Sequence, residues 1–155
     1  YASFEKLILA VKNIYGPLFQ AMFPWMSKKN NLEMASITKK MILPLFGLGL
    51  SIFVVIYFGA DFIIRTIYAD ELISSYSNVF RLLGLIAIFS ALNMLFNTLY
   101  LSARKKYKER MLIMVITGVL NIVVGIGLVQ NYDIWGIAFT VTLSEFLLLV
   151  FFFEL

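Results

Sequence analysis

The chain contains no cysteine and no histidine. These two absences exclude disulfide bonds, thiolate and imidazole chemistry, and the usual ligand sets of zinc and haem. Charge is also scarce, because only 14% of the 155 residues are charged, against about 25% in an ordinary soluble domain. A soluble core needs a charged exterior to cover it, so we expect this chain to lie in a membrane.

Hydrophobic residues make up 61% of the sequence and gather in long runs. A helix needs about 20 apolar residues to cross roughly 30 Å of hydrocarbon. The runs are continuous and carry polar residues at helical spacing, which favours helices over barrel strands. We therefore predict an all-α, polytopic membrane helix bundle with about five transmembrane helices, at about 4–26, 41–60, 79–101, 111–130 and 134–155.

The first of these segments is the weakest prediction, because three charges interrupt it: Glu5, Lys6 and Lys12. The loop charges support it nevertheless. Cytoplasmic loops carry an excess of Lys and Arg, and two connections here are basic, around 28–40 and 104–110. The connections that hold Asp61, Asp70 and Glu71, and Asp133, are not basic, so we place them outside. This alternation requires the first segment to span. The net charge of +4 fits membrane orientation better than nucleic acid, which we do not expect as a partner.

Three charges fall inside predicted spans, where each costs about 2.5 to 3.5 kcal/mol on insertion scales. They are Glu5, Lys12 and Glu145. On a helical projection Glu5 and Lys12 share one face with Gly16 and Gln20, and this polar stripe is a candidate lining for a hydrophilic passage. Alternatively, Glu5 lies at the headgroup level and Lys12 snorkels or pairs with a carboxylate. Glu145 is far from both ends of its run and is either a functional group or a structural hydrogen-bond partner.

Milder polar signals occur in the third and fourth segments. Ser90, Asn93 and Asn97 share a face, and Thr117 and Asn121 are followed by Gly125 one turn later. We list Asn93, Asn97 and Asn121 as candidate cavity or coupling residues, although such residues commonly serve in helix packing. Gly47 with Ser51, and Gly136 with Thr140 and Ser144, match the spacing of small residues at helix contacts.

The second basic loop holds candidate contacts for anionic lipid headgroups or substrate phosphates: Arg104, Lys105, Lys106 and Lys108. Setting the membrane orientation is the simpler role for these residues. The sequence has no phosphate-binding glycine loop, acidic metal cluster or nucleophile beside a base, so we predict no enzyme, no cofactor and no metal.

The order of these features resembles the bacterial O-antigen and capsule flippases of the multidrug/oligosaccharidyl-lipid/polysaccharide exporter superfamily. The opening YASFEKLILAVKNIYGPLFQAMFPWMSKK is similar to a segment of that family, and so is WGIAFTVTLSEF, with its glutamate. The matching residues of the opening are Tyr1, Ala2, Glu5, Lys6, Pro24 and Ser27. The segment ARKKYKER departs from the glycine-bearing turn that the family often has there.

The resemblance implies a fragment of the C-terminal lobe, about the eighth to twelfth helices of a transporter with 12 to 14 spans. Because the chain starts at Tyr1 and ends inside an apolar run, we expect it to be cut at both ends. The implied function is flipping of undecaprenyl-diphosphate-linked oligosaccharide across the bacterial inner membrane by alternating access. The implied partners are the lipid bilayer, the lipid-linked oligosaccharide, H⁺ or Na⁺ as a coupling ion, and the remaining helices of the full-length chain.

Three alternatives stay open. The chain could belong to another branch of the same superfamily, which moves the peptidoglycan precursor lipid or small cationic drugs. It could be part of a membrane-embedded glycan polymerase or glycosyltransferase, whose catalytic groups would then lie in the outward loop among Arg65, Asp70, Glu71 and Arg81. It could also be a non-catalytic subunit of a membrane assembly.

Overall fold

The computed structural model describes residues 2–68 and 76–154, without the side chains of residues 2–5, 7, 8 and 68. The chain begins with α1 (Ala2–Met26) and α2 (Asn31–Tyr68). Three short pieces then follow one another as a single rod: α4 (Ser77–Gly84), α5 (Ile86–Met94) and a π-helix, η1 (Leu95–Leu101). The last element is α6 (Tyr107–Phe153). No strand occurs in these two ranges, so the all-α prediction is confirmed.

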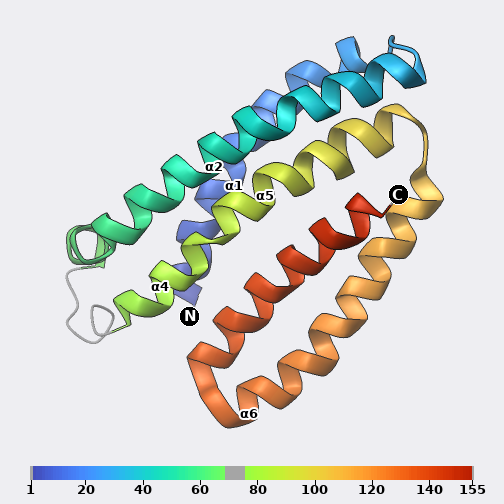
Figure 1. The fold of residues 1–155 in the computed structure, drawn as a ribbon. Helices are drawn as coiled ribbons and strands as arrows, with labels where there is room; N and C mark the ends of the chain where they lie inside the picture. Colours follow the sequence, from blue (N-terminus) through green and yellow to red (C-terminus); the bar gives the residue numbers. More distant parts are fainter. Residues whose placement is uncertain (1, 69–75, 155) are drawn as a thin grey trace.

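The predicted number of about five helices is wrong for the described residues, which form four helical elements: α1, α2, the rod Ser77–Leu101 and α6. The difference arises at the end of the chain, because the predicted segments 111–130 and 134–155 are one helical element, α6. Its backbone departs from helical geometry at Asp133, where α6 bends back on itself (Figure 1). We call the part before Asp133 the first arm and the part after it the second arm.

The predicted boundaries are close in α1 but too short in α2, which starts ten residues before the predicted 41–60 run. A capping box explains the early start. Asn30 Oδ1 accepts a hydrogen bond from the Glu33 backbone N–H at 2.8 Å, and the Asn30 N–H donates to Glu33 Oε2 at 3.3 Å. With 38 residues, α2 is about 57 Å long, longer than a hydrocarbon layer is thick.

The rod from α4 to η1 lies in the centre of the molecule (Figure 1). The helices α1 and α2 lie along one side of this rod, and the two arms of α6 lie along the other. One hydrophobic core is formed around Tyr15, Phe19, Leu95 and Leu99, and a second around Ile64, Phe80 and Ile86. Both cores include residues of the central rod, so this rod is the element that the other helices bury.

A glycine permits the close approach of α2 to α5. A Cβ atom at Gly49 would lie 2.8 Å from Ile88 Cα and 3.0 Å from the Ala87 carbonyl oxygen, which are backbone atoms. Gly47 and Ser51, which have the expected spacing for helix packing, are exposed instead, and the Ser51 hydroxyl donates to the Gly47 carbonyl within α2. The contact residue is therefore Gly49, two positions away from the predicted one.

The two arms of α6 also pack closely. A Cβ atom at Gly136 would overlap the Leu128 carbonyl, and one at Gly125 would lie 3.3 Å from Thr140 Cγ2. Here the predicted role of Gly136 and Thr140 in helix packing is confirmed. Small residues on both arms allow the chain to reverse direction and return along itself.

Three described helices are long and apolar enough to cross a membrane: α2 up to Ile67, the rod Ser77–Leu101, and α6. Among the described residues α1 does not meet this criterion, although it forms the predicted helix. The central rod is mostly buried, whereas α2 and α6 expose many large apolar side chains to the outside. Water is a poor solvent for such surfaces, and lipid is a good one. The fold is thus compatible with a membrane helix bundle.

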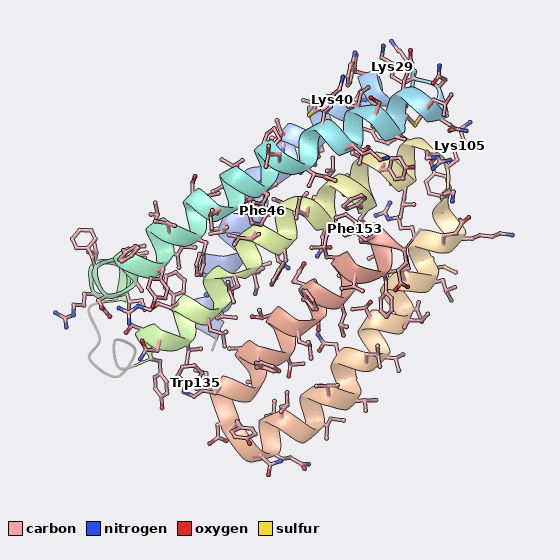
Figure 2. All side chains as sticks on the ribbon, in the orientation of Figure 1. Lys29, Lys40, Phe46, Lys105, Trp135 and Phe153 are labelled. Atoms are coloured by element: carbon pink, nitrogen blue, oxygen red, sulfur yellow. The ribbon has the colours of Figure 1, made fainter. Side chains whose placement is uncertain are left out.

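The two basic segments lie at the same end of the molecule. Figure 2 labels Lys29 and Lys40 beside the turn between α1 and α2, and Lys105 in the turn before α6, all near one end. Trp135, just after the bend of α6, lies near the opposite end. This arrangement agrees with the predicted placement of both basic loops on one side.

Candidate intramembrane polar site

An ion pair joins the first and the last helix of the structure. Lys12 of α1 forms a salt bridge through Nζ with Glu145 Oε1, which belongs to the second arm of α6. Both groups lie near the middle of their helices, and their side chains are 31% and 12% exposed. Two opposite charges in contact largely cancel each other's field, which reduces the cost of holding them away from water. Lys12 thus pairs with a carboxylate, as one of its two alternatives predicted, and Glu145 supplies that carboxylate.

A third helix holds the carboxylate in place. The Asn93 side chain of α5 donates through Nδ2 to Glu145 Oε2 at 2.7 Å and to the Glu145 backbone carbonyl at 2.8 Å. The two carboxylate oxygens therefore have different partners, one a cation and the other a neutral amide. Asn93 is 6% exposed, so this contact lies deep between the helices. The site is built by α1, α5 and α6 together.

A cavity of about 350 Å³ adjoins the ion pair. Lys12 lines it from α1, and all other lining residues come from the two arms of α6. Its polar wall consists of Lys12, Thr117, Asn121, Ser144 and Glu145, whereas Met114, Val141 and Leu148 are apolar parts of the wall. Asn121 donates to the Ser144 hydroxyl across the two arms, and this hydroxyl donates to the Thr140 carbonyl at 2.7 Å. The cavity thus presents amide, hydroxyl and paired charged groups from α1 and from both arms of α6.

Several buried polar atoms near the site have no hydrogen-bond partner among the described residues. Thr117, which lines the cavity, is 3% exposed, and its Oγ1 is one of them. The others in this region are Ser90 Oγ, Asn93 Oδ1 and Asn97 Oδ1, all on the central rod. Leaving a buried polar atom without a partner costs about 1 to 3 kcal/mol, so each of these atoms requires a partner such as a water molecule or a ligand.

The central rod is irregular directly beyond Asn93. The π-helix η1 contains Asn97, whose backbone carbonyl accepts a hydrogen bond from the Ser102 hydroxyl at 3.0 Å. Arg110, at the start of α6, in turn donates to the Ser102 hydroxyl at 2.8 Å. Segments of π-helix are rare and often mark functional sites. Here the segment links the polar site to the basic end of the molecule.

Among the remaining candidate residues whose side chains the structure describes, Gln20 and the basic loop residues do not contact the ion pair. Gln20 is exposed on α1, about two turns beyond Lys12, and the Glu5 side chain lies outside the described residues. The basic loop candidates lie at the end of the molecule, where Arg104 donates to the Tyr100 hydroxyl at 2.5 Å and lies over its ring. Lys105 has a positive φ of 58° and forms the turn before α6. Lys106 and Lys108 flank this turn, and Lys106 precedes α6.

The end of the molecule near α4 contains an ion pair between two helices. Arg81 pairs with Asp61 at 2.7 Å, donates to the Tyr57 carbonyl at 3.0 Å, and contacts Asn78. These contacts tie α4 to α2 and are structural in character. Asp70 and Glu71, which the glycosyltransferase alternative would use, lie outside the described residues.

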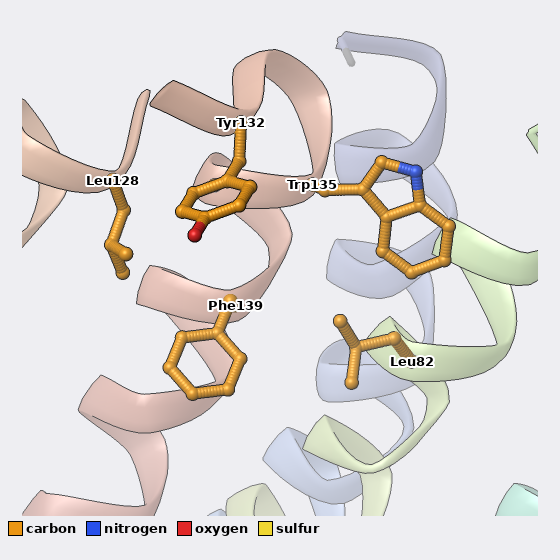
Figure 3. Close-up of a pocket in the computed structure, with 6 residues that line it drawn as sticks. Leu82, Leu128, Tyr132, Trp135 and Phe139 are labelled. Atoms are coloured by element: carbon orange, nitrogen blue, oxygen red, sulfur yellow. The ribbon is translucent and has the colours of Figure 1, made fainter. Parts of the chain in front are cut away.

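A second cavity, of about 290 Å³, lies beside the bend of α6 (Figure 3). Leu82 of α4 lies on one side of it, and Leu128, Tyr132, Trp135 and Phe139 of α6 complete the wall. Tyr and Trp are enriched where a membrane meets water, so this end of α6 has the composition of an interfacial region. The described residues that line this cavity offer apolar and aromatic surface for packing and include no charged side chain.

One polar contact could not have been found from the sequence. Tyr15 is fully buried on α1 and donates its hydroxyl to the Ala87 carbonyl at 2.9 Å, close to the α2–α5 contact at Gly49. Tyr15 and Phe19 recur with helical spacing, but nothing in that pattern specifies a carbonyl on another helix.

No protein-family model, curated protein or solved structure matches this chain.

Proposed function

We propose that this chain is part of a membrane transporter that moves a polar substrate past the ion pair of Lys12 and Glu145. The observation that carries the proposal is this charged pair, held by Asn93 and placed beside a cavity with a polar wall. Charges in the middle of apolar helices are expensive, and in membrane proteins they generally serve a pathway or a substrate site. A purely structural bundle would be more stable with apolar residues of similar volume at these positions.

The substrate class comes from the resemblance to polysaccharide flippases. On that basis the substrate is an undecaprenyl-diphosphate-linked oligosaccharide, moved from the cytoplasmic to the outer leaflet of a bacterial inner membrane. The sugar portion is too polar to cross hydrocarbon without a hydrated path. In this scheme each arm of α6 crosses the membrane once, since each has roughly 20 residues or more. Both basic turns then face the cytoplasm, as the excess of Lys and Arg there predicts.

A complementation experiment tests the proposal in bacterial cells whose surface glycan depends on the full-length protein. We expect Lys12→Ala to abolish surface glycan and to leave lipid-linked oligosaccharide on the cytoplasmic side. Lys12→Arg keeps the cation and its pairing with Glu145, and should retain glycan export. Normal export by both variants, at normal protein levels, would contradict the proposed role of the ion pair.

A further inference from the structure

The charge balance of the cavity limits what it can bind. Among the described residues, Lys12 is the one cation that lines it, and its ammonium group is engaged by the Glu145 carboxylate. The paired charges sum to zero, so a diphosphate entering the cavity would lose its hydration without meeting a net positive charge. It would also approach a carboxylate. The cavity is therefore poorly suited to the anionic part of a lipid-linked substrate.

The polar wall suits a neutral ligand with many hydroxyl groups. Thr117 Oγ1 is buried in the wall without a partner, and a hydroxyl group can both donate and accept a hydrogen bond. Asn121 and Ser144 add an amide and a second hydroxyl. Met114 and Leu148, each about one helical turn from a polar lining residue on the same arm, offer apolar contact for the C–H face of a sugar ring. These groups lie on both arms of α6 and surround one space.

We propose that this cavity, between Lys12 and the two arms of α6, binds the uncharged sugar part of the substrate and excludes its diphosphate. The inference rests on the proposed function, because it divides one substrate into a part that this cavity holds and a part that it does not.

The experiment uses the full-length protein, with any cysteines outside this chain replaced, and single-cysteine variants labelled by a water-soluble maleimide. Gly118 lines the cavity, and a Cβ atom there would meet nothing within 4 Å, so Gly118→Cys places a thiol in the cavity without strain. Gly127→Cys is the matched control, because it lies on the same arm, has equal space and does not line this cavity. The probes are a neutral disaccharide, lactose, and inorganic pyrophosphate at equal concentration.

We expect Gly118→Cys to react several-fold faster than Gly127→Cys, lactose to slow its labelling several-fold, and pyrophosphate to leave the rate unchanged. Adding Thr117→Val should remove the protection by lactose, whereas Thr142→Val should keep it. Thr142 is also buried on α6, but its hydroxyl donates to the Ala138 carbonyl and it does not line the cavity. Saturation-transfer NMR with lactose checks the same variants without a thiol.

Two results would overturn the inference. The first is slow labelling of Gly118→Cys, equal to that of Gly127→Cys, which would mean that water does not enter the cavity. The second is protection by pyrophosphate in place of lactose, or protection by lactose that Thr117→Val leaves intact. Neither result would change the outcome of the complementation experiment, because that experiment measures glycan export in cells. If the proposed transport function is wrong, the complementation experiment shows it, whatever ligand the cavity binds.

Discussion

At the scale of single residues, we expect substitution of Lys12 or Glu145 to lower stability strongly, because each side chain neutralises the charge of the other. They are 133 positions apart in the sequence and meet between two helices. Removing one partner leaves the other charged and largely enclosed, which is costlier than removing both. Asn93 adds to the effect, since its amide is oriented toward the same carboxylate.

We predict that Lys12→Met and Glu145→Gln each lower the free energy of unfolding by about 2 kcal/mol. This value lies between the losses measured when exposed ion pairs and buried ion pairs are broken. The double variant should lose less than the sum of the two. Thermal unfolding in detergent measures all three proteins. The exchanged pair, Lys12→Glu with Glu145→Lys, serves as a control and should recover part of the loss. Strictly additive losses would show that the two side chains do not interact.

The turn in α6 depends on one residue with unusual backbone angles. Asp133 has φ 47° and ψ −123°, a combination that glycine adopts easily and other residues adopt at a cost of about 1 to 3 kcal/mol. Asp133 is exposed, so its side chain can be removed without opening a core.

We therefore predict that Asp133→Gly stabilises the protein by about 1 kcal/mol. Asn131→Gly is the control, because that residue lies in the helical part of the first arm, where glycine costs about 0.5 to 1 kcal/mol. Thermal unfolding in detergent should give shifts of opposite sign for the two variants. A loss of stability in both would mean that residue 133 does not have this conformation.

At the scale of helices, the contact between α2 and α5 depends on the absence of a side chain at Gly49. A Cβ atom at that position would meet backbone atoms of Ala87 and Ile88, which cannot rotate away as a side chain would. The same helix offers a neighbouring glycine, Gly47, with nothing within 4 Å of its Cβ position.

We predict that Gly49→Ala lowers the melting temperature in detergent, because α2 and α5 must separate to admit a methyl group. Gly47→Ala should leave it unchanged or raise it, since alanine favours a helix by up to about 1 kcal/mol over glycine. Equal effects of the two substitutions would mean that α2 does not pack on α5 at Gly49.

At the scale of the whole molecule, the two basic turns and the bend of α6 lie at opposite ends (Figure 2). A bundle that crosses a membrane in this orientation exposes its ends to two different compartments. The chain has no cysteine, so a single thiol introduced at either end reports its own side.

We predict that Leu32→Cys and Tyr107→Cys are labelled from the same side of sealed vesicles, the cytoplasmic one, and Tyr132→Cys from the other. All three positions are exposed, and none of the substitutions changes a charge that sets orientation. A membrane-impermeant maleimide applied to intact cells and to inverted vesicles makes the measurement. Labelling of Leu32→Cys and Tyr107→Cys from opposite sides would exclude this topology.

The sequence by itself determined the class of structure, because composition and run length act locally. Long apolar runs can satisfy their backbone groups only as helices in lipid, and the described residues are helical as predicted. The isolated charges at Lys12 and Glu145 were likewise visible, since each lies within an apolar run. The number of helical elements was predicted wrongly, because the last two predicted segments join at the kink at Asp133 and form one element, α6.

Only the tertiary structure decided which polar groups meet. A helical projection places Lys12 and Gln20 on one face of α1, but the direction in which α1 packs buries Tyr15 and Phe19 and leaves Gln20 exposed. Glu145 becomes the partner of Lys12 because α6 turns back at Asp133 and brings its second arm beside α5. Contacts between distant segments depend on crossing angles and close approaches such as that at Gly49, which no local pattern encodes.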